Sequence, residues 1–275
     1  FSVDGIGYIC TGYDPNDYTS DLFAYDPIAD SWTPRAPFPG SPRASAVGFS
    51  IGSKGYVCSG SYIIPGMMTA HGPEVEAELR GGDGNGVFDG LYEYDPATDS
   101  WSQKSNLPGG GRSNAMAFVI DGIAYVGTGY GDYDIDLQQY IYYNDLWAYD
   151  PVTDEWTEKA PYPGSGREGL VSFAINGKGY AGGGYNELYE SYADFYEYDP
   201  VADAWTEKAP LQGGALGNGV GLAMDGTGYV TTGDYLGTSH ALWAYDPTQN
   251  SWTAKADFAA PPGDYGRNGA TGFTI

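Results

Sequence analysis

Basic residues are scarce in this sequence of 275 residues. Lysine and arginine together number 12 against 36 aspartates and glutamates, which gives a formal net charge of −24. Such a chain lacks the basic surface that binding to nucleic acid or to anionic membranes requires. The excess of carboxylates favours solubility and suits an extracellular setting.

Long apolar runs and cysteines are scarce as well. No run approaches the roughly 18 apolar residues that a membrane-spanning helix needs. No stretch has the pattern of a secretory leader, although a chain that begins within a strand-like segment is compatible with a leader already removed. The two cysteines, Cys10 and Cys58, stand at matching positions of neighbouring repeats. Such positions are usually too far apart for a disulfide, so we expect two small buried residues.

Glycine, proline and tyrosine are abundant instead. The chain has 43 Gly, 18 Pro and 26 Tyr, and 41% of its residues are hydrophobic. Turn formers combined with aromatic strand formers are typical of an all-β protein with many short strands. The hydrophobic share is sufficient for a packed core.

An internal repeat organises the whole sequence. FAYDPIADSWTPRAP and WAYDPVTDEWTEKAP are two of five copies, whose tryptophans are Trp32, Trp101, Trp156, Trp205 and Trp252. Each repeat is predicted to form four strands, shown by the third: AMAFVI, a turn at Asp121 and Gly122, AYVGTG, then LWAYDP and a strand with Trp156. The tryptophans are spaced by 69, 55, 49 and 47 residues, and the later spacings are close to the roughly 50 residues of a kelch repeat.

These features resemble the kelch family, in the style of its bacterial secreted or surface members. The resemblance lies in the Tyr and Trp with six residues between them and in the small residues that end each second strand. The double glycine of the family is intact only at Gly183 and Gly184, since Thr or Ser takes its first position elsewhere. The resemblance implies a β-propeller in which each repeat is one four-stranded blade.

We predict five blades in a single domain over residues 1–275. Inner strands begin at Arg43, Arg112, Arg167 and Leu216, and the final GRNGATGFTI fits the same frame from Arg267. The C-terminal strand would then close the first blade, which gives blades at residues 266–275 with 1–38, 39–107, 108–162, 163–211 and 212–257. Residues 1–3 align with the same place, so the alternative is a fragment of a six-bladed propeller.

The face that carries the long loops between second and third strands is the predicted binding face, because variable loops on a rigid scaffold concentrate binding residues. Four arginines at inner-strand starts are expected to ring the channel mouth and to grip an anion, beside loop tyrosines that suit sugars or polar partners. In the alternative interpretation, each arginine pairs with a nearby carboxylate or carbonyl and holds blades together. The predicted binding residues are Arg43, Arg112, Arg167, Arg267, Tyr13, Tyr130, Tyr185 and Tyr235.

Two acidic loops are candidate calcium sites, and no other cofactor is expected. Oxygen ligands at alternating positions suit Ca²⁺, but both loops lack the glycine and distal glutamate of a complete EF-hand loop. Solvated acidic loops are the alternative. The candidate ligands are Asp132, Asp134, Asp136, Asp83, Asn85 and Asp89.

The leading hypothesis is a non-catalytic binding module, secreted or on a bacterial cell surface, that engages a glycan or a protein. One alternative is a carbohydrate-active enzyme at the channel mouth. An oxidase of the galactose-oxidase type is disfavoured because His71 and His240 lie in different blades, whereas a kelch sialic-acid mutarotase would use an Arg and a Glu such as Arg167 and Glu168. A further alternative is a structural subunit of a surface assembly, docked through loop 61–90 by strand addition.

Overall fold

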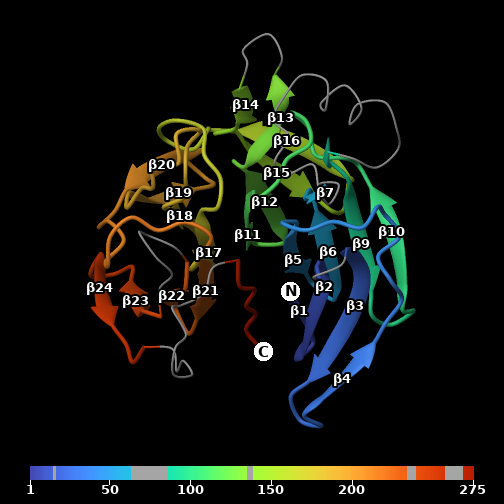
Figure 1. Ribbon diagram of the computed structural model, residues 1–275. Coiled ribbons are helices and arrows are strands. Elements are labelled where there is room, and N and C mark those ends of the chain that lie inside the picture. The colour runs from blue at the N-terminus through green and yellow to red at the C-terminus, as the bar shows by residue number, and fades with distance from the viewer. Residues whose placement is uncertain (15–16, 63–85, 135–138, 234–239, 258–268) are drawn as a thin grey trace. The chain divides into compact units, whose positions relative to one another are not determined.

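The computed structural model describes residues 1–14, 17–62, 86–134, 139–233, 240–257 and 269–275. Every regular element among these residues is a strand, and no helix there is long and apolar enough to cross a membrane. The five repeats form five antiparallel four-stranded sheets, as the sequence predicts (Figure 1). Their strands are β1 (Ser2–Val3), β2 (Ile6–Tyr13), β3 (Tyr18–Asp26) and β4 (Ser31–Pro34); β5 (Val47–Ile51), β6 (Lys54–Cys58), β9 (Leu91–Asp95) and β10 (Ser100–Lys104); β11 (Met116–Ile120), β12 (Ile123–Gly127), β15 (Leu146–Asp150) and β16 (Glu155–Lys159); β17 (Val171–Ile175), β18 (Lys178–Gly182), β19 (Phe195–Asp199) and β20 (Ala204–Glu207); and β21 (Val220–Met224), β22 (Thr227–Thr231), β23 (Leu242–Asp246) and β24 (Ser251–Ala254).

Two short hairpins extend loops of the second and third repeats. They pair β7 (Ser61–Tyr62) with β8 (Gly86–Val87), and β13 (Tyr130–Asp134) with β14 (Gln139–Tyr142). The chain divides into two compact units, with the first two sheets in unit 1 and the last three in unit 2. Unit 1 comprises Phe1–Ala115, Tyr130–Ile141 and Ile275, and unit 2 comprises Met116–Gly129 and Tyr142–Thr274. That all five blades form one domain stays a prediction.

Local turn chemistry explains why the strands begin and end where they do. Asp121 and Gly122 have φ values of 50° and 82°, the double left-handed geometry that joins tightly paired strands. At the next turn of the same sheet, the Asp150 carboxylate accepts the N–H of Val152 at 2.8 Å. Asp154, with φ of 57°, accepts the Tyr149 hydroxyl at 2.9 Å. Both predicted turns are confirmed.

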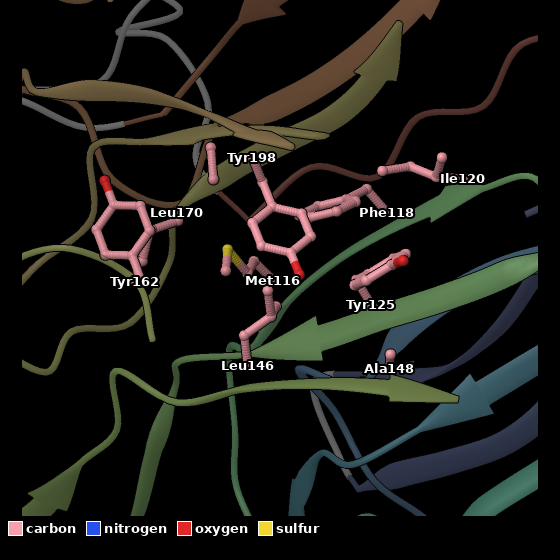
Figure 2. Close-up of a cluster of buried hydrophobic side chains, with 10 residues drawn as sticks. Met116, Phe118, Ile120, Tyr125, Leu146, Ala148, Tyr162, Leu170 and Tyr198 are labelled. Carbon is pink, nitrogen blue, oxygen red and sulfur yellow. The ribbon is translucent and has the colours of Figure 1, made fainter. Parts of the chain in front are cut away.

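The core of unit 2 lies between neighbouring sheets and combines aromatic rings with aliphatic side chains (Figure 2). Tyr198 of the fourth sheet packs against Phe118 and Tyr125 of the third, with ring centroids 6.2 and 5.4 Å apart. Gly179 in β18 is necessary for this packing, because a Cβ there would collide with the Phe118 ring. Each ring buries a large apolar area, so the contacts between sheets carry much of the hydrophobic stabilisation.

The first sheet is completed by residues 1–3, so the prediction that the C-terminal strand closes it is wrong. Ser2 and Val3 pair with Gly7 and Ile6. The Phe1 ring occupies the space beside Gly55 of the second sheet, as the Phe118 ring does beside Gly179. The described C-terminal residues, 269–275, form no strand, and the Gly269 N–H donates to the Asn218 carbonyl of the fifth repeat at 3.1 Å. That a sixth blade exists stays a prediction.

The two cysteines are unpaired, as predicted. Cys10 is half-buried and Cys58 is buried. Burial raises the pKa of both thiols to about 12, so neither is a thiolate at neutral pH.

A two-point clamp, made by a turn residue and a tryptophan of one sheet, holds the segment that leaves the preceding sheet. In unit 2, Trp205 donates its indole N–H to the Ala160 carbonyl at 3.0 Å, and the Asp203 carboxylate accepts the Ala160 N–H at 2.9 Å. Because both backbone groups of one alanine are bound, the position of that segment is fixed along the strand direction. The same clamp joins Ala36 to Asp99 and Trp101 in unit 1, and Ala209 to Asn250 and Trp252 in unit 2.

We expect Asp203→Ala to lower the free energy of unfolding by about 1–2 kcal/mol, because Tyr198 O–H and Ala160 N–H lose a shared acceptor. Asp203→Asn is the matched control, since Asn250 already accepts the equivalent two bonds in the fifth sheet. Urea unfolding followed by tryptophan fluorescence measures both. Equal midpoints for the alanine and asparagine variants would show that the accepted hydrogen bonds do not stabilise the fold.

The clamp also predicts acid sensitivity. The pKa of Asp99 lies below its ordinary value, chiefly through the Tyr94 hydroxyl, and that of Asp203 through the Ala160 N–H. Each carboxylate is therefore protonated more readily in the unfolded chain, so stability is complete above about pH 4 and is lost as pH falls through the lower folded pKa values. A double variant with Asp99→Asn and Asp203→Asn should lose less stability between pH 5 and pH 2 than the parent. Parallel stability curves against pH would contradict this assignment.

Candidate functional site

A sharp turn at the end of each second strand brings a loop residue beside the start of the inner strand. In the second repeat, Ser59 and Gly60 both have positive φ, 64° and 101°. A Cβ at Gly60 would lie 2.9 Å from the Ala44 carbonyl oxygen, so only glycine fits there. The residue after the glycine then bridges the inner-strand start, in the pairs Ala44 with Ser61, Ser113 with Tyr130, and Glu168 with Tyr185. This confirms that inner-strand starts and these loops share one face within each unit.

The described arginines at inner-strand starts are buried, and each guanidinium group binds residues of its own unit. Arg43 donates to the carbonyls of Ser41 and Ser59 at 3.0 and 2.9 Å. Its guanidinium carbon lies 4.0 Å from the centre of the Phe88 ring. Burial lowers the pKa of Arg43 to about 10, so the group stays charged at neutral pH. Arg112 likewise donates to backbone carbonyls.

Arg167 has an acidic partner and two aromatic ones. It donates to the Asp194 carboxylate at 2.7 Å and lies 3.8 Å above the Tyr192 ring and 5.2 Å from the Tyr162 ring. Burial raises the pKa of Asp194 above its ordinary value, and the attraction of Arg167 opposes that rise only in part. These contacts favour the interpretation in which the arginines hold their sheets and loops together. That they bind a ligand stays a prediction.

The predicted tyrosines lie in different surroundings. Tyr13 is exposed and packs edge-on against Tyr18 at 5.0 Å between ring centroids. Tyr130 is half-buried, with its ring 6.0 Å from that of Tyr140. Tyr185 is half-buried, and its ring occupies the space where a Cβ of Gly217 would stand. Arg267 and Tyr235 lie outside the described residues.

The proposed calcium ligands fall only partly within the described residues. Asp83, Asn85 and Asp136 lie outside them, as do His71 and most of loop 61–90. Asp132 is exposed and Asp134 half-buried, while the Asp89 carboxylate accepts the Asn106 amide at 3.0 Å. In the described part of the chain, no group of three or more His, Cys, Asp or Glu could hold a metal ion. A calcium site stays a prediction.

Three polar residues of unit 2, Glu168, Tyr185 and Asn218, have neighbouring backbones at the start of the fourth inner strand. Glu168 exchanges backbone hydrogen bonds with Tyr185, both at 2.9 Å, and is only 9% exposed. A Cβ at Gly169 would lie 2.6 Å from the Asn218 side-chain oxygen, so the absent side chain leaves room for this amide next to the residue that follows Glu168. We call Glu168, Tyr185 and Asn218 the Glu168 site. It combines an acid–base group with two hydrogen-bonding groups, which suits a polar ligand.

Glu168 is distinctive when the repeats are compared. The matching residues at the other described inner-strand starts are Ala44, Ser113 and Gly217, none of which titrates. Asn218 was missed by the sequence reasoning, although a signal was present. The residue after this position is Ser45, Asn114, Gly169, Asn218 or Gly269, and all five have φ between 51° and 68°. Residues that tolerate a left-handed backbone thus recur in every repeat, two positions after the residue at which the inner strand starts.

Comparisons with known proteins support the fold and favour an enzyme. No protein-family model matches the chain. N-acetylneuraminate epimerases of Escherichia coli strain K12 and of Shigella flexneri are 34% identical over 128 residues, which cover 42% of this chain and 34% of each relative. The matched part therefore spans about a third of the length of these relatives. The solved structure of YjhT superposes with a TM-score of 0.69 at 17% identity, over 91% of this chain and 83% of that one.

The fold prediction is confirmed, and the leading functional hypothesis is corrected. The five four-stranded sheets and the likeness to YjhT establish an all-β, kelch-type β-propeller with five blades. The hypothesis of a non-catalytic binding module is overturned, because the similar curated proteins are named as epimerases. The alternative of a carbohydrate-active enzyme is the one that the comparisons favour.

We expect Arg167→Met to destabilise the protein by about 3 kcal/mol, because it leaves the partly buried Asp194 without its cation. The pKa of Asp194 would rise further, so the folded variant would take up a proton more readily than its unfolded chain and would gain stability as pH falls from 7 to 5. Adding Asp194→Asn should restore part of the loss at pH 7. Thermal unfolding measures all three proteins, and an unchanged Tm for Arg167→Met would contradict the structural role of the pair.

Proposed function

We propose that this chain interconverts the anomers of an acidic sugar of the N-acetylneuraminate type. The observation that carries the proposal is the placement of Glu168, the one titratable side chain among the described residues at this inner-strand position, beside Tyr185 and Asn218. The identity to N-acetylneuraminate epimerases over 128 residues supplies the substrate class.

Anomer exchange requires only proton transfers and a rotation. A base removes the proton of the anomeric hydroxyl, the bond between the anomeric carbon and the ring oxygen breaks, and its electron pair passes to that oxygen, which takes a proton. The open-chain ketone turns about one bond, and the ring oxygen then attacks the other face of the carbonyl. Atoms and charge balance without a redox partner, and a positioned acid–base group accelerates each transfer.

Within the Glu168 site, the Glu168 carboxylate would accept the anomeric proton and return it to the ring oxygen. The Tyr185 phenol and the Asn218 amide would hydrogen-bond the sugar and hold it in one orientation, which lowers the entropic barrier. The arginines are not assigned a chemical role, because their guanidinium groups already bind carbonyls and Asp194.

The proposed location is extracellular or on a bacterial cell surface, as in the kelch proteins that the repeats resemble. The net charge of −24 supports this location.

Glu168→Gln tests the proposal. We expect the wild-type protein to accelerate exchange between the α and β anomers of N-acetylneuraminate, followed by proton NMR exchange spectroscopy. The glutamine variant should lose about 100-fold or more of that acceleration, because it cannot accept a proton. Glu158→Gln removes an exposed carboxylate of β16 and is the matched control. Equal rates for Glu168→Gln and the wild type would remove Glu168 from the reaction.

A further inference from the structure

The loop that follows Tyr185 is ordered by one buried side chain. Asn186 is 5% exposed, and its carbonyl oxygen accepts the backbone N–H groups of Leu188 and Glu190 at 3.0 and 2.9 Å. Its amide nitrogen donates to the Glu190 carboxylate and to the Tyr192 hydroxyl, both at 2.9 Å. All hydrogen-bonding capacity of this amide is directed at the loop, so these four hydrogen bonds define the shape of the loop.

The base of the same loop is tied to the buried ion pair. Tyr192, which receives the Asn186 amide, lies 3.8 Å from the guanidinium carbon of Arg167, and Arg167 binds Asp194 at 2.7 Å. This chain of contacts connects the loop to the interior of unit 2. The loop is therefore held at its base by contacts with buried residues of unit 2, and its other end extends into solvent as a projection.

The tip of this projection presents two large apolar residues to solvent. Leu188 is 69% exposed and Tyr189 is 79% exposed. Tyr189 also has φ of 57°, a left-handed conformation that is unfavourable for a residue other than glycine. Glycine would satisfy the backbone better and would expose less apolar surface. A strained, exposed aromatic that contributes nothing to packing points to a role outside the fold.

The loop that carries the tip begins and ends beside Tyr185 of the Glu168 site. Tyr185 bridges Glu168 on one side and Ser191, at the returning end of the loop, on the other. Tyr189 is three residues beyond Asn186, so its backbone is at most about 10 Å further along the chain. Within this limit, a sugar bound with its anomeric carbon at Glu168 can extend toward the tip.

The charged residues beside the tip determine which part of an acidic sugar binds there favourably. Glu187 and Glu190 flank the two apolar residues, and both are exposed. They disfavour a carboxylate, whereas a neutral group with an apolar face gains contact with the Tyr189 ring and the Leu188 side chain. The N-acyl group of an amino sugar acid is such a group, since its methyl is apolar and its amide is uncharged.

We propose that Leu188 and Tyr189 form a subsite for the N-acyl group of the sugar whose anomeric carbon reacts at Glu168. This inference rests on the proposed function and deepens it, because it makes the loop of residues 186–192 the determinant that selects N-acylated sugar acids. Asn186 is its positioning residue.

Tyr189→Gly is the direct test. The substrates are N-acetylneuraminate and the analogue that carries a hydroxyl in place of the N-acetyl amide, and kcat/KM for anomer exchange is measured for each by NMR. The wild type should prefer the N-acetyl sugar, and the variant should lose about ten-fold of that preference through a higher KM. Its urea midpoint should be unchanged or higher, because glycine relieves the left-handed strain. Leu188→Ala keeps the backbone and should shift the preference in the same direction.

Val201→Ala is the matched control, since Val201 is 93% exposed in the turn between β19 and β20, away from the loop. It should leave the preference unchanged. A preference unaltered by Tyr189→Gly and by Leu188→Ala would overturn the subsite while leaving the proposed function standing. A loss of rate equal for both sugars would also overturn it, because the loop would then act on Glu168. Absence of exchange with the wild-type protein would overturn the proposed function and the subsite together.

Discussion

The clamp on a single connecting alanine is the interaction on which the arrangement within each unit depends. A tryptophan indole and a turn carboxylate or amide bind the C=O and the N–H of one residue, as at Ala160, Trp205 and Asp203. Ring packing between sheets is apolar and only weakly directional, whereas two hydrogen bonds at fixed spacing define the register of one sheet against the next. Positions that match in the repeat consequently match in space along each unit, and the inner-strand starts take equivalent places on their own sheets.

The proposed site lies where this regular framework is broken. Four of the inner-strand starts offer a site with the same backbone, and only the fourth fills it with a carboxylate, at Glu168. Two glycines, Gly169 and Gly217, then leave the space that the Asn218 amide and the Tyr185 ring occupy. The same repeat carries the short loop that Asn186 orders. A chemically distinct site thus results from changes at a few positions. The clamp and the buried arginine still hold the sheets and loops of this repeat together.

Much of the fold was predictable because its determinants are local. The repeat, the Asp-Gly turn at Asp121 and the strand pattern depend on residues close together in sequence, and all were confirmed. The sequence left two interpretations of Arg167 open. Its partner Asp194 lies 27 residues away, and only the folded chain brings the two side chains together. The closing strand of the first sheet was wrongly assigned because two segments have the same pattern, and the fit of the Phe1 ring beside Gly55 decides between them. Of the candidate site, Glu168 was named only as a residue that a mutarotase would use. Asn218 was missed because its place beside Gly169 depends on contact between sheets.

The central claim is that a kelch-type propeller with one carboxylate-bearing inner strand acts on the anomeric centre of an acidic sugar. The most direct measurement is the rate at which freshly dissolved N-acetylneuraminate reaches its anomeric equilibrium with and without the wild-type protein, beside glucose as a neutral reducing sugar. The account predicts a concentration-dependent acceleration for N-acetylneuraminate and none for glucose. Equilibration of N-acetylneuraminate at the uncatalysed rate, at every protein concentration, would contradict it.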